Sequence, residues 1–179
     1  MKVRAVLPVL FLLSAFVVTA PAGEGKKEHQ NQSGKNAGLE QFKQLAGEWV
    51  GKEIGHGAEQ AEVHIKYQVT SAGHTVVETI FPGTAHEMVT VIHPDGDDLV
   101  LTHYCALGNQ PQMKAKNAGD GNSIAFKFTG ATNMKSDKDM HMHDATYTFV
   151  DKDTLKSEWS TYMDGKPGGK VVFELKRKK

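Results

Sequence analysis

Cysteine is nearly absent from the sequence, because Cys105 is the only one among 179 residues. A single cysteine cannot form an intramolecular disulfide, so the fold must be held together without one. Cys105 itself is interpreted as a small apolar residue of a strand, as a thiol that pairs with another chain, or as a ligand.

Excess charge of one sign is also missing, because 21 basic residues balance 21 acidic ones. A chain without net charge has no strong attraction to nucleic acid or to an anionic membrane surface. Nucleic acid is therefore not expected as a partner.

Catalytic motifs are missing as well. No nucleophile elbow of the form G-x-S-x-G occurs, and no phosphate-binding glycine loop opens a helix. The carboxylates of Asp95, Asp97 and Asp98 lie at a predicted hairpin turn, where aspartate is favoured for its backbone geometry. The sequence thus favours a protein that is not an enzyme.

The first 22 residues predict a secretory signal peptide. Lys2 and Arg4 form a positive start, residues 5–20 are apolar, and Ala20-Pro21-Ala22 fits a cleavage site. Pro8 and the small residues near the end of the run differ from a retained transmembrane helix, which needs about 20 apolar residues. We expect a secreted or periplasmic protein with no membrane span after cleavage.

Residues 23–38 contain no large apolar side chain. Such a segment cannot bury enough surface to offset its ordering entropy, so it predicts a disordered linker. The remaining residues, 39–179, have the length of one domain.

Apolar residues recur with a period of two throughout this domain, which is typical of strands with one buried face. Ten such stretches are separated by turns rich in Gly, Asp and Pro, and no amphipathic run is long enough for a crossover helix. We predict an all-β fold, an antiparallel up-and-down β-barrel of about ten strands, since closure removes exposed edges. Residues 140–150 are expected to be the longest strand, and residues 176–179 a solvated basic end.

A short N-terminal helix is predicted at residues 39–46, where apolar residues have helical spacing. The helix runs into Gly47, Trp49 and Gly51 at the head of the first strand. This opening resembles that of the calycin-like small β-barrels, which include lipocalins, fatty-acid-binding proteins and nitrobindin-like barrels. The late strands are also similar to those of secreted lipocalin-like bacterial proteins.

The resemblance implies that the helix closes one barrel end, that the tryptophan packs beneath it, and that a small, often hydrophobic ligand is held inside. Nitrobindin-like barrels bind haem through a histidine near the C-terminus. No histidine follows His143 in this sequence, so haem is not expected as a cofactor.

His141 and His143 give the sharpest local pattern in the domain. On a strand, residues i and i+2 share a face and lie about 6.6 Å apart, so two imidazoles at this spacing can bind one metal ion. The same face continues through Ala145 and Tyr147, which places both histidines inside the barrel and Met142 outside.

The same alternation in residues 98–105 places His103 and Cys105 inside as well. A set made of His103, Cys105, His141 and His143 suits zinc or copper. Alternatively, the histidines anchor a carboxylate or another head group of an organic ligand, as in pockets with an apolar lining and a few polar groups. The candidate ligand-binding residues of this second hypothesis are His103, Tyr104, His141, His143, Tyr147 and Trp159.

The sequence therefore favours an exported barrel that binds a small, partly apolar molecule in its interior. Metal binding through the His/Cys set is one alternative, and a non-catalytic scaffold that binds proteins by its outer face is another. The lining or core is expected from the aromatic residues Trp49, Tyr67, Phe126, Phe128, Tyr147, Phe149 and Trp159.

Cleavage after Ala22 gives a testable expectation. The protein recovered from outside the cytoplasm of its host should begin at Gly23, because signal peptidase recognises the small residues at Ala20 and Ala22. N-terminal sequencing or the intact mass of the secreted protein measures this. A chain that retains Lys2 and Arg4 would contradict the prediction.

Overall fold

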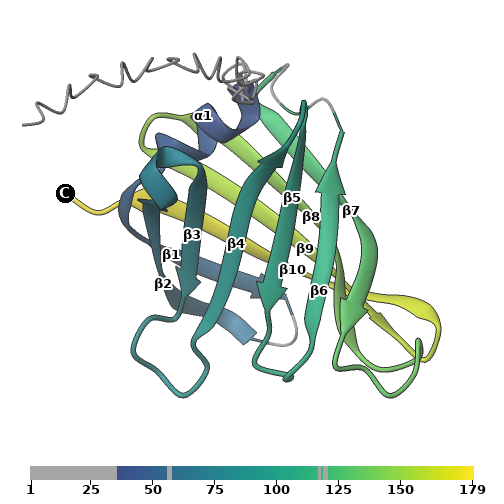
Figure 1. Cartoon of the computed structure of the whole chain (residues 1–179). Coiled ribbons are helices and arrows are strands. Elements are labelled where there is room, and N and C mark those ends of the chain that lie inside the picture. The colour runs from purple at the N-terminus through teal and green to yellow at the C-terminus, as the bar shows by residue number, and fades with distance from the viewer. Residues whose placement is uncertain (1–35, 56–57, 117, 119–120) are drawn as a thin grey trace, which may run out of the picture. The chain divides into compact units, whose positions relative to one another are not determined.

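A computed structural model describes residues 36–55, 58–116, 118 and 121–179, with the side chains of residues 58–60 left aside. These residues form one closed β-barrel (Figure 1). The signal peptide and most of the predicted linker, up to residue 35, lie outside the described residues.

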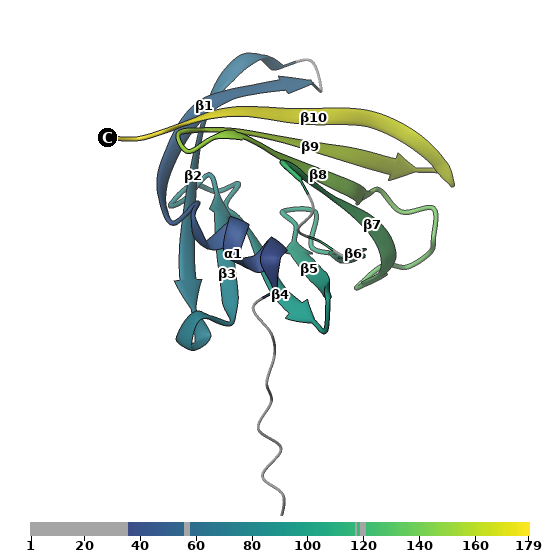
Figure 2. The same ribbon diagram turned by 90° about the horizontal axis from the view of Figure 1, so that it is seen from above.

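Ten antiparallel strands make the barrel wall, as predicted. Each strand pairs with its neighbour in the sequence, and the first strand closes the barrel on the last (Figure 2). A single turn of 3-10 helix, Ser71–Gly73, joins the second and third strands. The strands are β1 (Gly47–Gly55), β2 (Ala58–Thr70), β3 (Thr75–Ile80), β4 (Met88–Asp95), β5 (Asp98–Tyr104), β6 (Gln110–Ala115), β7 (Ser123–Thr132), β8 (His141–Asp151), β9 (Thr154–Met163) and β10 (Lys166–Arg177).

Strand lengths differ from the sequence prediction. The longest strand is β2 with 13 residues, and β10 with 12 residues is also longer than β8 with 11. The prediction for residues 140–150 was wrong because polar and glycine-containing stretches, which weaken the sequence signal, still pair in β2 and β10.

The N-terminal helix α1 (Ala37–Lys43) begins two residues earlier than predicted. Asn36 caps it, because its side chain accepts a hydrogen bond of 3.0 Å from the backbone N–H of Leu39. The side-chain amide of Asn36 also donates to Gly96 O and Asp98 O, which ties the helix to the β4–β5 hairpin. A Cβ atom at Gly38 would lie 2.8 Å from that of Ala118, so glycine permits this close approach.

Helix α1 lies across one end of the barrel (Figure 2). Its Phe42 is fully buried, with ring centroids 5.0 Å from Tyr147, 5.4 Å from Phe149 and 6.0 Å from Phe126. A buried phenylalanine contributes about 2–3 kcal/mol of transfer free energy, so this contact holds a helix too short to stand alone.

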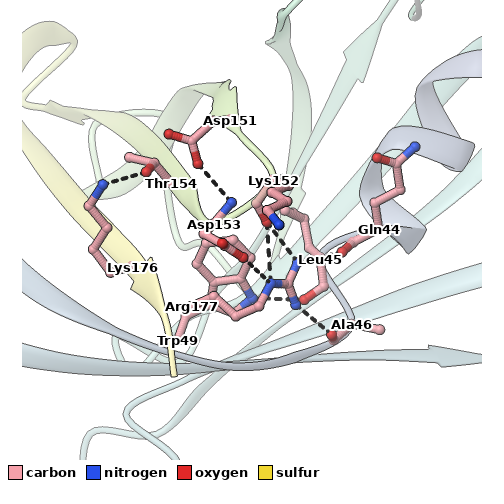
Figure 3. A network of polar contacts seen from close by, with 10 residues as sticks. All are labelled: Gln44, Leu45, Ala46, Trp49, Asp151, Lys152, Asp153, Thr154, Lys176 and Arg177. Carbon is pink, nitrogen blue, oxygen red and sulfur yellow. Dashed lines mark hydrogen bonds and ion pairs between the residues drawn. The ribbon is translucent and has the colours of Figure 1, made fainter. Parts of the chain in front are cut away.

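The side chain of Arg177 connects several segments of the chain at the barrel end that helix α1 covers (Figure 3). Its guanidinium carbon lies 4.4 Å from the centre of the Trp49 ring, a cation–π contact. The same group donates to Gln44 O at 2.6 Å and to Ala46 O at 2.9 Å, which are carbonyls just after helix α1. It also donates to Lys152 O and pairs with Asp153 at 3.4 Å in the β8–β9 turn.

Residues 176–179 are therefore not simply a solvated basic end. Lys178 forms an exposed ion pair with Glu48, but Arg177 binds three other segments of the chain. The prediction failed because a run of basic residues is read as one solvated face, whereas a strand alternates its sides.

Replacement of Arg177 by methionine should lower the free energy of unfolding by about 2–4 kcal/mol. The variant loses the cation–π contact and leaves several carbonyls without a donor. Urea unfolding followed by tryptophan fluorescence measures the change. Lys178→Met is the matched control, because its ion pair with Glu48 is exposed to solvent and its loss should leave the free energy of unfolding nearly unchanged. Equal effects of the two substitutions would contradict this role of Arg177.

Candidate functional site

A carboxylate lies inside the barrel wall at Glu78 of β3, and it is fully buried. The hydroxyl of Tyr67 donates to Glu78 Oε1 at 2.6 Å, and the hydroxyl of Tyr147 donates to Oε2 at 2.9 Å. Thr90 of β4 supplies a third hydroxyl bond to the carboxylate. Side chains from β2, β3, β4 and β8 thus meet at one acceptor in an otherwise apolar core.

Burial shifts the ionisation of this group. It raises the pKa of Glu78, whereas the hydroxyl bonds from Tyr67, Tyr147 and Thr90 act in the opposite direction. Burial, followed by the negative charge of Glu78, raises the pKa of both tyrosines well above the usual value. Both phenols therefore stay protonated and serve as donors.

Thr90 continues the polar contacts to a histidine. Its Oγ1 lies 3.0 Å from Nδ1 of His103 in β5, which is 1% exposed. Burial lowers the pKa of His103 to about 4, so the imidazole is neutral at physiological pH. Glu78, Thr90 and His103, with the two tyrosines, form what we call the buried polar chain.

The buried polar chain ends at an aromatic contact across the barrel. The rings of His103 and Trp159 of β9 have centroids 4.9 Å apart, and Trp159 is 2% exposed. Six side-chain atoms of the described residues are buried without a hydrogen-bond partner from the protein. Three of them are His103 Nε2, Trp159 Nε1 and the hydroxyl of Ser157, and the others are Gln41 Oε1, Asn109 Oδ1 and His141 Nε2. Three polar atoms from two facing walls therefore remain unsatisfied in the interior.

The structure brings three of the predicted ligand-binding residues together. Tyr147 and His103 belong to the buried polar chain, and Trp159 contacts both of their rings. Tyr104, by contrast, is 50% exposed, because it follows the buried His103 on the same strand. Tyr104, a candidate ligand-binding residue, therefore faces away from the interior, since neighbouring residues of a strand face opposite sides.

His141 and His143 do not follow the predicted alternation, because β8 has a bulge between Met142 and Asp144. Met142 pairs with Thr161, in the buried row of β9, and packs against the core. His141 pairs with Tyr162 in the other row. The extra residue interrupts the predicted alternation at this point: His141 is 2% exposed, whereas Met142 and His143 are both partly buried.

The two histidines instead form a separate cluster of rings with Phe128 and Tyr162. His143 stacks between Phe128 at 4.6 Å and Tyr162 at 4.8 Å, and His141 lies 5.7 Å from His143. Nδ1 of His141 contacts Asp139 O at 2.7 Å, and Nδ1 of His143 contacts Asp144 at 3.2 Å. Phe128, predicted for the lining or core, is only partly buried here, as is Phe149 against α1.

The predicted metal set is divided by this arrangement. His103 bonds to Thr90 and contacts Trp159, whereas His141 and His143 belong to the ring cluster. Cys105 lies just beyond the end of β5, partly buried, with its N–H bonded to Asn109 O. Among the described residues, no three His, Cys, Asp or Glu side chains converge as a metal site requires.

Sequence reasoning missed the central residue of the site. Glu78 lies on the same buried face of β3 as Val76 and Ile80, so a carboxylate occupies a position in the buried row of this strand. A charged residue in such a row is rarely buried without partners, and this was a usable signal. Thr90 gave no comparable signal, because threonine is common on both faces of strands.

A groove of about 410 Å³ lies elsewhere, along β1, β8, β9 and β10. Gly51, Val150, Lys156 and Lys176 are among its lining residues, and none of its lining residues belongs to the buried polar chain. The groove is therefore separate from the interior site.

Comparisons with known proteins show the fold alone. No family model matches the chain, and no curated protein matches its sequence. The crystal structure of Rv2717c from M. tuberculosis is similar with a TM-score of 0.57 at 14% identity, over 79% of this chain and 98% of that one. A protein of unknown function from the DUF3598 family of Nostoc punctiforme has a TM-score of 0.51 at 13% identity, over 76% of this chain and 48% of that one.

These similarities show a related barrel fold and carry no information on a ligand. Within the described residues, no helix has the length and apolar character needed to cross a membrane.

Acid should destabilise the protein through His103. Its pKa is about 4 in the fold and about 6.5 when unfolded, so the unfolded chain binds the proton first as the pH falls. The stability linked to neutral His103 is present above pH 6.5 and is lost toward pH 4. Between pH 7.5 and 4.5 this amounts to about 2 kcal/mol.

His103→Leu should therefore lose about 2 kcal/mol less than the wild type over this pH range, as measured by urea unfolding. Glu78, whose pKa is raised, contributes with the opposite sign, but it is present in both proteins. His64→Leu is the control, because the side chain of His64 is half exposed on β2. An unchanged pH dependence in His103→Leu would contradict the burial of a neutral imidazole.

Proposed function

We propose that the protein is an exported binding protein that holds a small, partly apolar molecule inside the barrel. The polar group of this molecule bonds to Nε2 of His103 and Nε1 of Trp159. The observation that supports the proposal is that both nitrogen atoms are buried without a protein partner while their rings lie 4.9 Å apart.

The energetics of unsatisfied groups favour this proposal. A buried polar atom without a hydrogen bond costs about 1–3 kcal/mol, and native proteins contain few of them. Ser157 adds a third such atom on the same strand as Trp159. One polar molecule that bonds to these groups removes several penalties at once.

The surroundings suit the apolar part of such a molecule. Ile92, Leu101 and Met113 are fully buried in the wall that contains His103 and its neighbours. Barrels of this size hold small ligands among apolar side chains, and a few polar groups fix their orientation.

Export is part of the proposal and is supported by the sequence of residues 1–22. The proposal does not include a metal ion, because His103 contacts Thr90 whereas His141 and His143 contact each other. Among the described residues, no three potential ligands, Cys105 included, come together.

Native mass spectrometry of the chain 23–179, purified from its own host without chelator, tests the proposal. We expect a mass excess that corresponds to one small organic molecule. An excess that corresponds to zinc or copper would replace the proposal with the metal hypothesis. A bare mass would contradict it.

Two variants locate the bound molecule. His103→Leu and Trp159→Phe each remove one unsatisfied nitrogen and should reduce the bound fraction about tenfold, since one hydrogen bond contributes about 1 kcal/mol or more. His64→Leu removes an exposed histidine and should leave the bound fraction unchanged. Full occupancy in both interior variants would place the ligand elsewhere.

A further inference from the structure

The groove along β1, β8, β9 and β10 is open to solvent, because Lys52, Val150 and Glu174 of its lining are exposed. Its volume of about 410 Å³ falls in the range of pockets that hold small molecules, about 300–1,000 Å³. A small molecule can therefore reach this groove without any movement of the barrel.

Val150 is the apolar side chain at the edge of the groove. It is 57% exposed, the highest fraction among the exposed large hydrophobic residues of the described part of the chain. It lies at a bulge, because the pairing of β8 with β9 shifts register between Phe149 and Asp151. Bulges are common next to active sites, where they re-aim a side chain. An apolar residue is thus held in solvent where a ligand in the groove would cover it.

The charged side chains of the lining are three lysines and one glutamate. Glu174 of β10 pairs with Lys52 of β1 on one side and with Lys156 of β9 on the other. Lys176 follows two residues later on β10 and therefore lies on the same face of the strand as Glu174. The lining carries three positive charges and one negative charge.

Lys156 and Lys176 keep donors for a further partner. Lys156 lies 3.3 Å from Glu158, and the charge of Asp151 interacts with Lys176, but neither acid lines the groove. Lys176 also donates to the hydroxyl of Thr154 (Figure 3). An ammonium group has three N–H donors, so these contacts leave others for a ligand.

The stems of the lysines add apolar surface to the groove. A lysine covers its surroundings with methylene groups while its ammonium group stays in water. The groove thus combines Val150 and methylene groups with cationic tips. A molecule with an apolar body and a negative group matches both features, whereas a cation would meet three like charges.

We infer that the groove binds a small organic acid. Its apolar body covers Val150 and the lysine stems, and its acidic group lies beside the ammonium groups of Lys156 and Lys176. The groove shares no lining residue with the buried polar chain, so this second site does not rest on the proposed function.

Probes of one chain length and different charge test the ligand class. Octanoic acid, octan-1-ol and octylamine are titrated into the chain 23–179 by calorimetry near neutral pH, where the acid is negative and the amine positive. We expect the acid to bind at least about fivefold more tightly than the alcohol, and the amine to bind most weakly. The affinity for the acid should also fall as salt is added. Equal binding of all three probes, tightest binding of the amine, or no binding of the acid would overturn the inference.

A double variant, Lys156→Met with Lys176→Met, locates the acid. It keeps apolar stems and removes two ammonium groups, so the affinity for octanoic acid should fall about tenfold while that for octan-1-ol changes little. Lys66→Met with Lys135→Met is the matched control, because both lysines are exposed and lie outside the groove. Equal losses in the two double variants, or no loss in the groove variant, would overturn the site.

Val150→Asp should reverse the preference for charge. A carboxylate at this position repels octanoic acid and attracts octylamine, so the acid should bind at least about tenfold more weakly and the amine more tightly. Met163→Asp is the control, because Met163 is 51% exposed and lies at the other end of β9 from the groove residue Thr154. Unchanged binding of both probes in Val150→Asp would overturn the contact with Val150.

His103→Leu separates the groove from the interior site. His103 does not line the groove, so the affinity for octanoic acid should be the same as in the wild type. A loss in His103→Leu as large as that in the lysine double variant would place the acid in the interior. That outcome would overturn the groove site and leave the proposed function intact.

Discussion

The side chain of Arg177 joins parts of the chain that are distant in sequence, at the place where the first and last strands close the barrel. Its strand pairs with β1, where its Cα partner is Trp49, and its guanidinium lies over the Trp49 ring. The same group satisfies carbonyls after helix α1 and at the β8–β9 turn. A guanidinium suits this position, because its planar fork bonds to several carbonyls while its face stacks on an aromatic ring.

Closure at this end separates the polar groups of the interior from solvent. Helix α1 covers the opening with Phe42, which packs on the ring of Tyr147, a donor to Glu78. Water is thereby kept from a carboxylate whose three hydroxyl partners come from β2, β4 and β8. In a low-dielectric core such hydrogen bonds are stronger, and an unpaired group is more costly, so the buried polar chain fixes the relative positions of strands on different walls.

The side-chain nitrogens His103 Nε2 and Trp159 Nε1, in contrast, have no hydrogen-bond partner from the protein. Every described polar group from Tyr67 to Nδ1 of His103 has a partner, and the pairing stops at the facing rings. The proposed ligand would continue the buried polar chain, since two unsatisfied polar atoms on neighbouring rings favour a molecule with a polar group between them. The ring cluster around His141 and His143 is a different feature, built by the bulge in β8 and separate from these contacts.

The sequence by itself determined the fold class and the number of strands, because alternation of apolar residues and the chemistry of turns are local properties. It also indicated Trp49, Tyr147, His103 and Trp159 as interior residues. The tertiary structure decided the rest. Three features depend on the register between different strands. The first is the bulge that interrupts the alternation near His143, and the second is the contact of Arg177 with the segment after helix α1. The third is the contact of Glu78 with Tyr67, Thr90 and Tyr147. Register is a relation between distant segments, and no local pattern encodes which side chains it brings together.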